Sequence, residues 1–315
     1  MKKVIFIAIV IILVGLIIAC PFLYFLFGPR LDQNQLDTVL ILMIIASCSA
    51  LYCFVVGEIT GNNSQMDKLW SLLPIAYVWV IAGKGGMSPR LVIMAIITTL
   101  WGIRLTFNFA RKGAYKLRFW EGKEDYRWEI VRGNKLLKPH WKWVLFNLFF
   151  ICIYQNIVVL FTCLPAVIVM SSTVELGWVD YLATGFALFF LIFETVADEQ
   201  QYDFQTVKWR MLGEGKRLEE LPEPFRKGFN TTGLWGVSRH PNYLGEQGFW
   251  VFFYVFTIGG GIGVFNYSAI GALLLITLFL GSSTLTEGIS SSKYPEYSEY
   301  MSKVSRYFPW RKYDN

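Results

Sequence analysis

Long apolar stretches separated by polar connections constrain the fold of this sequence more than any other feature. A helix needs about 20 mostly apolar residues to cross the hydrocarbon core of a membrane, and eight stretches come near that length. They cover residues 4–27, 38–57, 69–83, 91–110, 142–170, 179–199, 243–260 and 264–286. With 54% hydrophobic and only 17% charged residues, the chain has more apolar side chains than one water-soluble core could bury. The sequence therefore predicts an all-α, polytopic membrane helix bundle of about eight spans, of which the fifth is long enough to tilt or to break near Pro165.

The lysines and arginines are distributed unevenly over the connections. Segment 111–142 contains ten and segment 200–242 contains seven, whereas the connections at 171–178 and 261–267 contain none. If all eight stretches cross the membrane, the basic segments and both basic termini lie on one side. Cytoplasmic loops carry such an excess of positive charge, so we expect both termini in the cytoplasm. The net charge of +6 then reflects membrane topology, and we expect no nucleic-acid partner.

The first apolar stretch begins like a secretory signal peptide, because a basic start precedes it and Cys20 stands where a lipoprotein would be cleaved. The stretch continues to Phe27, which makes it longer than a typical signal core. We therefore expect it to remain as a first span.

Several kinds of site are excluded by what the sequence lacks. It contains no P-loop, no HExxH and no GxSxG motif. The five cysteines show no CxxC spacing, which excludes a disulfide scaffold. Only two histidines, His140 and His240, are present, so a His-rich metal centre is excluded and we predict no metal site.

Polar residues inside apolar stretches are costly and usually functional, and the first group of them lies in the fourth stretch. Trp101, Arg104, Asn108 and Arg111 follow at spacings of three, four and three residues, which places them on one helical face. A side chain that extends to the membrane surface explains Arg111. Arg104 lies about two turns deeper, which favours a functional role.

A second group ends the sixth stretch. Glu194, Asp198 and Gln201 share a helical face, and Glu199 and Gln200 are adjacent. A polar helix end in the headgroup layer explains Glu199. Glu194 lies within the apolar run and needs a partner, which a basic loop or a polar ligand could supply.

The third and richest group, residues 233–246, joins a basic segment to the seventh stretch. Arg239 and His240 stand at the start of a helix, where free N–H groups already favour anions. Asn242 and Glu246 then share a face that enters the membrane. One interpretation is a helix start with an interfacial histidine. The other is a phosphate or carboxylate site, which the continuing polar face favours.

The fourth group is Asp67, Lys68 and Trp70 at the start of the third stretch, preceded by a polar run at 62–65. This pattern fits a capped helix start as well as it fits a functional site.

The segment Ser-Arg-His-Pro-Asn-Tyr-Leu-Gly-Glu at 238–246 resembles the C-terminal signature of the steroid 5-alpha-reductase-like membrane proteins, in particular of the branch known as the DUF1295 family. Sterol C14 and C7 reductases carry a similar motif with an aspartate at the position of Glu246. Further similar motifs are NSQMDKLW at 63–70, WGIRL at 101–105, EDYRW at 124–128, ADEQ at 197–200, and Tyr297, Tyr300 and FPW at 308–310 in the tail. The resemblance covers about residues 60–310.

This resemblance implies a membrane-embedded, NADPH-dependent reductase of a carbon–carbon double bond in a lipid-soluble, steroid- or enone-like substrate. NADPH would enter from the cytoplasm and the substrate from the lipid bilayer. Two N-terminal helices over residues 1–58 would precede a catalytic domain over 59–315. The residues implied at the cofactor are Glu194, Asp198, Gln200, Arg239, His240, Asn242, Tyr243, Glu246 and Tyr300. The residues implied as catalytic, at the substrate, are Asp67, Trp101 and Arg104.

Two departures from the family pattern affect the implied chemistry. Steroid reductases polarise a carbonyl with a carboxylate, whose counterpart is Asp67, and a tyrosine, whose place Trp101 takes. The relatives have basic residues for the cofactor phosphates where this chain has serines at 290–292. Serines hydrogen-bond phosphate without charge assistance.

Two other functions stay open. One is an S-adenosylmethionine-dependent methyltransferase of the isoprenylcysteine carboxyl type, which shares Arg-His-Pro-x-Tyr-x-Gly; those enzymes have a Glu-Glu pair where Glu287 is followed by Gly288. The other is a non-catalytic lipid-binding protein. In each case we expect an integral membrane protein of a bacterial inner membrane or an endoplasmic reticulum, with its site facing the cytoplasm.

Overall fold

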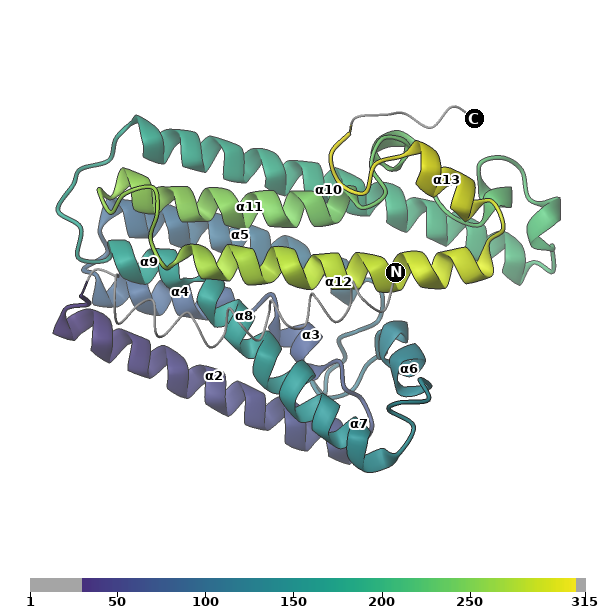
Figure 1. The fold of residues 1–315 in the computed structure, drawn as a ribbon, viewed down its shortest axis with the longest axis horizontal. Helices are drawn as coiled ribbons and strands as arrows, with labels where there is room; N and C mark the ends of the chain where they lie inside the picture. Colours follow the sequence, from purple (N-terminus) through teal and green to yellow (C-terminus); the bar gives the residue numbers. More distant parts are fainter. Residues whose placement is uncertain (1–29, 310–315) are drawn as a thin grey trace. The chain divides into compact units, whose positions relative to one another are not determined.

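The computed structural model describes residues 30–309, and every regular element in that range is helical (Figure 1). The first expected span, residues 4–27, lies outside the described residues. The described chain forms two compact units. The N-terminal unit runs from residue 30 to Thr184 and includes Phe252–Leu274, and the C-terminal unit consists of Gly185–Val251 and the residues from Leu275 to 309. The boundary expected at residue 58 stays a prediction; residues on both sides of it belong to the N-terminal unit.

The N-terminal unit contains two long helices and several shorter ones. They are α2 (Gln33–Thr60), α3 (Gln65–Leu69), α4 (Leu73–Lys84), α5 (Pro89–Ala110), α6 (Tyr126–Arg132), α7 (His140–Phe146), the π-helical segment η1 (Asn147–Tyr154), α8 (Gln155–Thr162) and α9 (Leu164–Val169). Asp32 and Gln35 form a reciprocal capping box at the start of α2, and Gly61, at φ 67°, ends it. Pro89 opens α5, where a missing N–H costs nothing.

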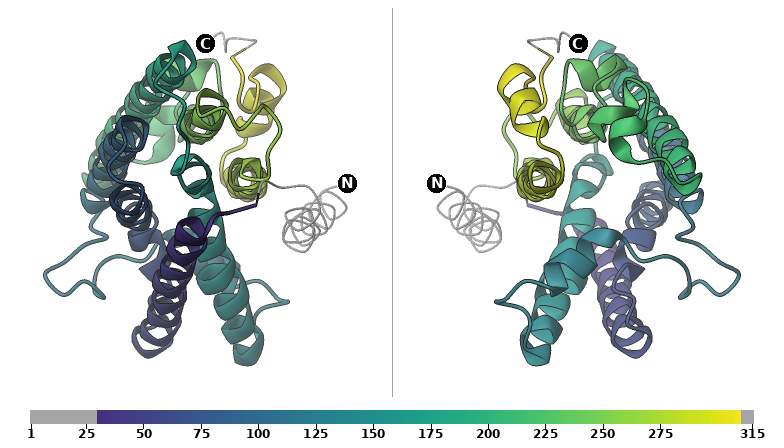
Figure 2. Two further views of the ribbon diagram at one scale, coloured as in Figure 1. Left: turned by 90° about the vertical axis from the view of Figure 1, so that its left-hand side faces the viewer. Right: turned by 90° about the vertical axis from the view of Figure 1, so that its right-hand side faces the viewer.

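Packing within the N-terminal unit follows the apolar faces of these helices. α4 packs along α5, with a 2.9 Å hydrogen bond from Trp79 Nε1 to Thr99 Oγ1 and a 2.7 Å one between the Ser71 and Thr106 hydroxyls. α2 packs against η1 and α8, which cross it in Figure 2. The fifth stretch breaks between α8 and α9, because Pro165 stands in the first turn of α9. This confirms the break expected there.

The rest of the described chain contains three long helices, each of which lies partly in both units. Short helices lie between the long ones or follow the last of them. The helices are α10 (Trp178–Gly213), η2 (Leu218–Glu220), η3 (Phe225–Lys227), η4 (Gly233–Gly236), α11 (Pro241–Gly259), α12 (Ala269–Lys293) and α13 (Tyr297–Lys303). α10 continues past residue 199, where the apolar stretch ended, because Phe204 and Lys208 are buried in the C-terminal unit. α11 approaches α10 closely at Gly245 and Gly248, where an added Cβ would lie 2.5 Å from Glu194 and 2.4 Å from Phe190. Small residues permit such contacts between membrane helices.

Within residues 30–309, five helical segments are long and apolar enough to cross a membrane. They are Gln33–Thr60, Pro89–Ala110, His140–Val169, Trp178–Gly213 and Ala269–Lys293. Large apolar side chains cover their outer faces, among them Leu40 and Leu51 on α2 and Phe107 on α5, all more than half exposed. Lipid can cover such faces, whereas water cannot do so without cost. α4, with twelve residues, is a shorter apolar helix, and α11 is not among the five.

A buried ion pair joins helices at one end of the N-terminal unit. Arg90 Nε on α5 lies 2.7 Å from Asp180 on α10, and both side chains are almost fully buried. Arg90 also donates to the carbonyl of Gly259 at the end of α11, at 3.0 Å. A Cβ at residue 259 would lie 2.5 Å from the Asp180 carboxylate, so the space is available only to glycine. The sequence analysis did not single out this pair.

Candidate functional site

The expected substrate residue Asp67 contacts a distant part of the chain in the N-terminal unit. We call residues 111–142, which connect α5 to α7 and contain α6, the basic arm. Trp128 Nε1 on α6 donates a 2.8 Å hydrogen bond to Asp67 Oδ2 on α3. The Asp125 backbone N–H donates to Ser64 Oγ at 2.9 Å, and the Asp125 side chain caps α6. Hydrogen bonds between two sequence motifs thus link the α3 region to α6.

Lys68 also holds the basic arm. Its side chain is buried, and Nζ donates to the carbonyls of Phe119 at 2.9 Å and Glu121 at 2.7 Å. The Tyr115 hydroxyl donates to the Lys68 carbonyl at 2.8 Å. The Asp-Lys-x-Trp pattern therefore does more than mark the start of a helix, because its lysine, Lys68, binds the backbone of the basic arm.

Glu124 completes this junction. Its carboxylate accepts from the Asn63 backbone N–H at 2.7 Å and from Arg132 Nη2 at 2.9 Å. Arg132 Nη2 also donates to Asn63 Oδ1 at 2.8 Å. The motifs at 63–70 and 124–128, noted separately in the sequence, form one structure.

Two carboxyl groups at this junction have pKa values shifted in opposite directions. Burial raises the pKa of Asp67, and nearby Asp125 raises it further, against the opposing effects of the Arg127 charge and the Trp128 hydrogen bond. Burial also acts to raise the pKa of Asp125, but the Arg127 guanidinium beside it, with Nε 2.8 Å from the carboxylate, lowers that pKa overall. Two carboxyl groups whose pKa values are shifted in opposite directions can divide the roles of general acid and general base. Asp67 is suited to hold a proton and Asp125 to remain ionised.

The other expected substrate residues lie on α5 of the same unit. Trp101 is fully buried, and Arg104 lies one turn further along the helix and is partly buried. Asn108 Oδ1 accepts hydrogen bonds from Arg111 at 3.1 and 2.8 Å. The polar face expected from the spacing is therefore present on α5.

The C-terminal unit contains a second polar cluster, centred on Glu287 of α12. The Glu287 carboxylate accepts from Arg239 Nε at 2.8 Å and from Arg306 Nη2 at 2.7 Å, and it lies 3.1 Å from His240 Nε2. Arg239, His240 and Glu287 are largely buried, whereas Arg306 is about one-third exposed. One carboxylate thus joins the loop before α11 to the tail after α13.

The backbone reinforces the same junction. The Arg239 N–H donates to the Ser305 carbonyl at 2.9 Å, and the His240 N–H donates to the Arg306 carbonyl at 3.1 Å. The His240 ring stacks on Tyr243, with ring centres 5.2 Å apart. Burial lowers the pKa of His240 despite the neighbouring Glu287, so the imidazole is neutral at pH 7. Two guanidinium groups and one carboxylate then leave the cluster with a net charge of +1.

The acidic residues expected at the cofactor lie on α10 and α11 of the C-terminal unit. Asn242 Nδ2 donates to Asp198 Oδ1 at 3.2 Å, and Trp250 Nε1 donates to Glu246 Oε1 at 3.1 Å. Glu194 is buried where α10 meets Gly245. The shared helical faces read from the sequence are therefore brought together in this unit.

Gln200 and Tyr300, two further residues expected at the cofactor, bind backbone. Gln200 Oε1 accepts from the Leu234 N–H at 2.9 Å, and the Tyr300 hydroxyl donates to the Trp235 carbonyl. Both side chains hold the loop before α11 in place.

Three amide atoms in the C-terminal unit are buried without a hydrogen-bond partner among the described residues. They are Asn242 Oδ1, Gln247 Nε2 and Gln201 Oε1. Buried polar atoms nearly always have a partner, so these atoms leave room for a polar ligand or for water. Among residues 30–309, no group of three His, Cys, Asp or Glu side chains is arranged to hold a metal ion.

Sequence reasoning did not identify Glu287, Arg306 and Trp128 as site residues. Glu287 had a signal, since it is a carboxylate inside the last apolar stretch. Trp128 stands in the motif at 124–128, but its role is recognisable only from Asp67, far away in the sequence, and Arg306 had no signal.

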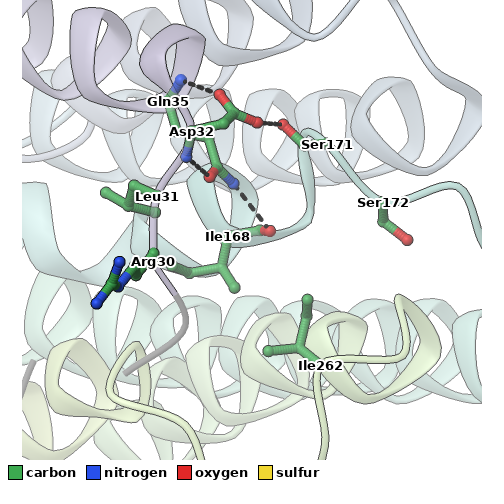
Figure 3. Close-up of a pocket in the computed structure, with 8 residues that line it drawn as sticks. All are labelled: Arg30, Leu31, Asp32, Gln35, Ile168, Ser171, Ser172 and Ile262. Atoms are coloured by element: carbon green, nitrogen blue, oxygen red, sulfur yellow. Dashed lines mark hydrogen bonds between the residues drawn. The ribbon is translucent and has the colours of Figure 1, made fainter. Parts of the chain in front are cut away.

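A small pocket lies at the start of α2, in the N-terminal unit (Figure 3). It has a volume of about 200 Å³, and Asp32, Gln35 and Ser171 are among the residues that line it. Ser171 donates to Asp32 there. The junction around Asp67 follows the other end of α2, and none of the expected site residues lines the pocket.

Comparison with known proteins identifies the family of this chain. The family described as "Protein of unknown function (DUF1295)" matches over residues 53–304. A similar protein is the "Uncharacterized protein C594.04c" of Schizosaccharomyces pombe, which is 36% identical over 279 residues, covering 82% of this chain and 78% of that one. No solved structure matches the chain. The matched residues contain both polar clusters except Arg306, and the chain belongs to the DUF1295 family.

Proposed function

We propose that this protein is a membrane-embedded, NADPH-dependent reductase of a carbon–carbon double bond in a lipid-soluble substrate. The observation that carries the proposal is the buried cluster of the C-terminal unit, in which Glu287 orders Arg239, His240 and Arg306. The two arginines and one carboxylate leave a positive charge at the start of α11, where free backbone N–H groups add to the attraction for an anion.

The residues of this unit fit the chemistry of a dinucleotide. The positive cluster suits phosphate oxygens, and Asp198 and Glu246 can accept hydrogen bonds from ribose hydroxyls. The unpartnered Asn242 Oδ1 and Gln247 Nε2 offer one acceptor and one donor, as a carboxamide requires. NADPH would supply the hydride when bound, and these side chains would bind and orient it.

Asp67, in the N-terminal unit, would act as a hydrogen-bond donor to the substrate. Its raised pKa favours the protonated carboxyl, which would donate a hydrogen bond to a carbonyl oxygen as negative charge develops there. Trp128 fixes the orientation of the carboxyl through its 2.8 Å hydrogen bond. The buried Trp101 provides an apolar surface that excludes water.

We also propose eight membrane crossings with both termini in the cytoplasm. The five long segments would be joined by residues 4–27, α4 and α11. The basic segments 111–142 and 200–242 then lie on the cytoplasmic side, as the distribution of lysine and arginine favours. Each polar cluster includes residues of one of these segments, so each would face the cytoplasm.

The test is to measure binding of NADPH and of S-adenosylmethionine, side by side, to the full-length protein purified in detergent. We expect NADPH to bind and Glu246→Gln to weaken it by about tenfold, since a buried charged acceptor becomes neutral. The matched control is Glu299→Gln, an exposed glutamate on α13 of the same unit, which should leave affinity unchanged.

Two other outcomes contradict the reductase, and a third contradicts the role of Glu246. Binding of S-adenosylmethionine alone would assign the cluster to methyl transfer. Binding of neither ligand, with or without lipid extract added, would favour a non-catalytic lipid-binding protein. NADPH binding that Glu246→Gln does not weaken would remove Glu246 from the site.

A further inference from the structure

The basic arm concentrates the positive charge of the whole chain. Residues 111–142 contain ten lysines and arginines and four acidic residues, a net charge of +6, which equals the net charge of all 315 residues. Membrane topology accounts for an excess of positive charge in this connection. The same surplus also attracts a negatively charged surface.

Three of the four acidic residues of the arm pair with its own arginines, and four of its lysines are left without an acidic partner among the described residues. Glu124 binds Arg132, Asp125 binds Arg127 and Glu121 binds Arg118. Four lysines remain exposed and have no acidic partner among residues 30–309. They are Lys116, Lys123, Lys135 and Lys138.

Large apolar side chains stand exposed among these lysines. Leu117 is fully exposed, Leu136 is 72% exposed and Trp141 is 62% exposed. Exposing apolar side chains of this size to water is energetically unfavourable. Lysine combined with tryptophan and leucine is typical of a membrane–water interface, where the ring and the aliphatic groups leave water and the ammonium group stays at the headgroups.

Both ends of the arm are fixed at the membrane. α5 ends at Ala110 and the segment His140–Val169 begins at the other end of the arm, and each is long and apolar enough to cross. The lysines are therefore held near the headgroup layer, within the range over which an anionic surface acts.

We propose that the outer face of the basic arm, formed by these four lysines with Leu117, Leu136 and Trp141, binds the anionic phospholipid headgroups of the surrounding membrane. The ammonium groups contact lipid phosphates, and the apolar side chains insert at the interface. The inner face of the arm holds Asn63, Asp67 and Lys68 through hydrogen bonds. Anionic lipid therefore stabilises the junction around Asp67 as well as the arm.

The test compares the full-length protein in nanodiscs of pure phosphatidylcholine with nanodiscs in which three in ten lipids are phosphatidylglycerol. The arm is probed by limited proteolysis with subtilisin, with cleavage sites mapped by mass spectrometry. We expect anionic lipid to slow cleavage within 111–142 by about fivefold or more and high salt to remove the protection. Cleavage within the turn 214–220, which has three acidic and two basic residues, serves as the internal reference and should not change.

A variant with Lys116, Lys123, Lys135 and Lys138 all changed to glutamine should lose the protection while keeping the helicity of the parent, because these lysines bind nothing else in the described chain. Lys216→Gln, in the reference turn, should keep the protection. Equal cleavage of the arm in both lipid mixtures would overturn the proposal. So would equal slowing of the reference turn, or protection that persists in the four-lysine variant.

Discussion

The indole of Trp128 donates a 2.8 Å hydrogen bond to the carboxyl of Asp67 across 61 residues of sequence. Asp67 lies on a short helix before the third apolar stretch, and Trp128 lies in a basic connection. The hydrogen bond links two family motifs and fixes a buried carboxyl whose pKa is raised. It is the contact on which the proposed acid depends.

Trp128→Phe should destabilise the protein and raise the pKa of Asp67 further. The change keeps the ring but removes the donor, and the hydrogen bond is one of the interactions that lower this pKa. We expect a loss of about 1–2 kcal/mol, measured by thermal unfolding in detergent. Trp120→Phe, at an exposed tryptophan of the same arm, is the control. Equal melting temperatures for the two variants would show that the hydrogen bond contributes nothing.

The pH dependence of stability should carry a contribution from Asp67. Because the folded pKa is raised above 3.8, the folded protein keeps a proton that the unfolded chain releases. This contribution is fully present below pH 3.8 and is lost as the pH rises through the folded pKa. Asp67→Asn cannot lose a proton, so its melting temperature should fall less than that of the parent as the pH rises from 4 to 7. Parallel melting curves across this range would contradict the raised pKa.

Glu287→Gln should strongly destabilise the C-terminal unit. The neutral amide would leave Arg239 and Arg306 buried or half-buried without a carboxylate, and breaking a buried ion pair in this way costs about 3 kcal/mol. Thermal unfolding is the measurement. Glu299→Gln removes an exposed ion pair with Lys303 and should cost less than about 1 kcal/mol. A small effect at both positions would mean that the cluster is not a structural centre.

Gly245→Ala should disturb the packing of α11 on α10. The new Cβ would lie 2.5 Å from the Cβ of Glu194, so one helix must move. We expect a loss of about 1–3 kcal/mol and weaker ligand binding, since Glu194 is among the residues expected at the cofactor. Gly281→Ala on α12, where an added Cβ meets nothing within 4 Å, is the matched control and should be neutral or stabilising. Tolerance of alanine at residue 245 would show that the two helices have room to separate.

Local pattern predicted the helices well. Apolar length was sufficient for α2, α5, α10 and α12, because a helix satisfies its backbone hydrogen bonds within one segment and a membrane leaves few other choices. The break before α9 followed from Pro165, whose ring cannot continue a helix. Helical spacing also predicted which side chains share a face, as with Asn242 and Glu246. These features depend only on residues within a few turns of one another.

Partners across the chain were decided by tertiary structure alone. The sequence did not indicate these partners, because Trp128 is 61 residues from Asp67, and Arg239 is 48 residues from Glu287. The ion pair of Arg90 with Asp180 joins residues 90 apart. Periodicity determines which face a side chain occupies, whereas helix packing determines what that face meets, and packing depends on contacts between distant segments. The sequence of this protein therefore determined its membrane helices and its family, and the tertiary structure decided which carboxyl has a raised pKa and which is paired with arginine.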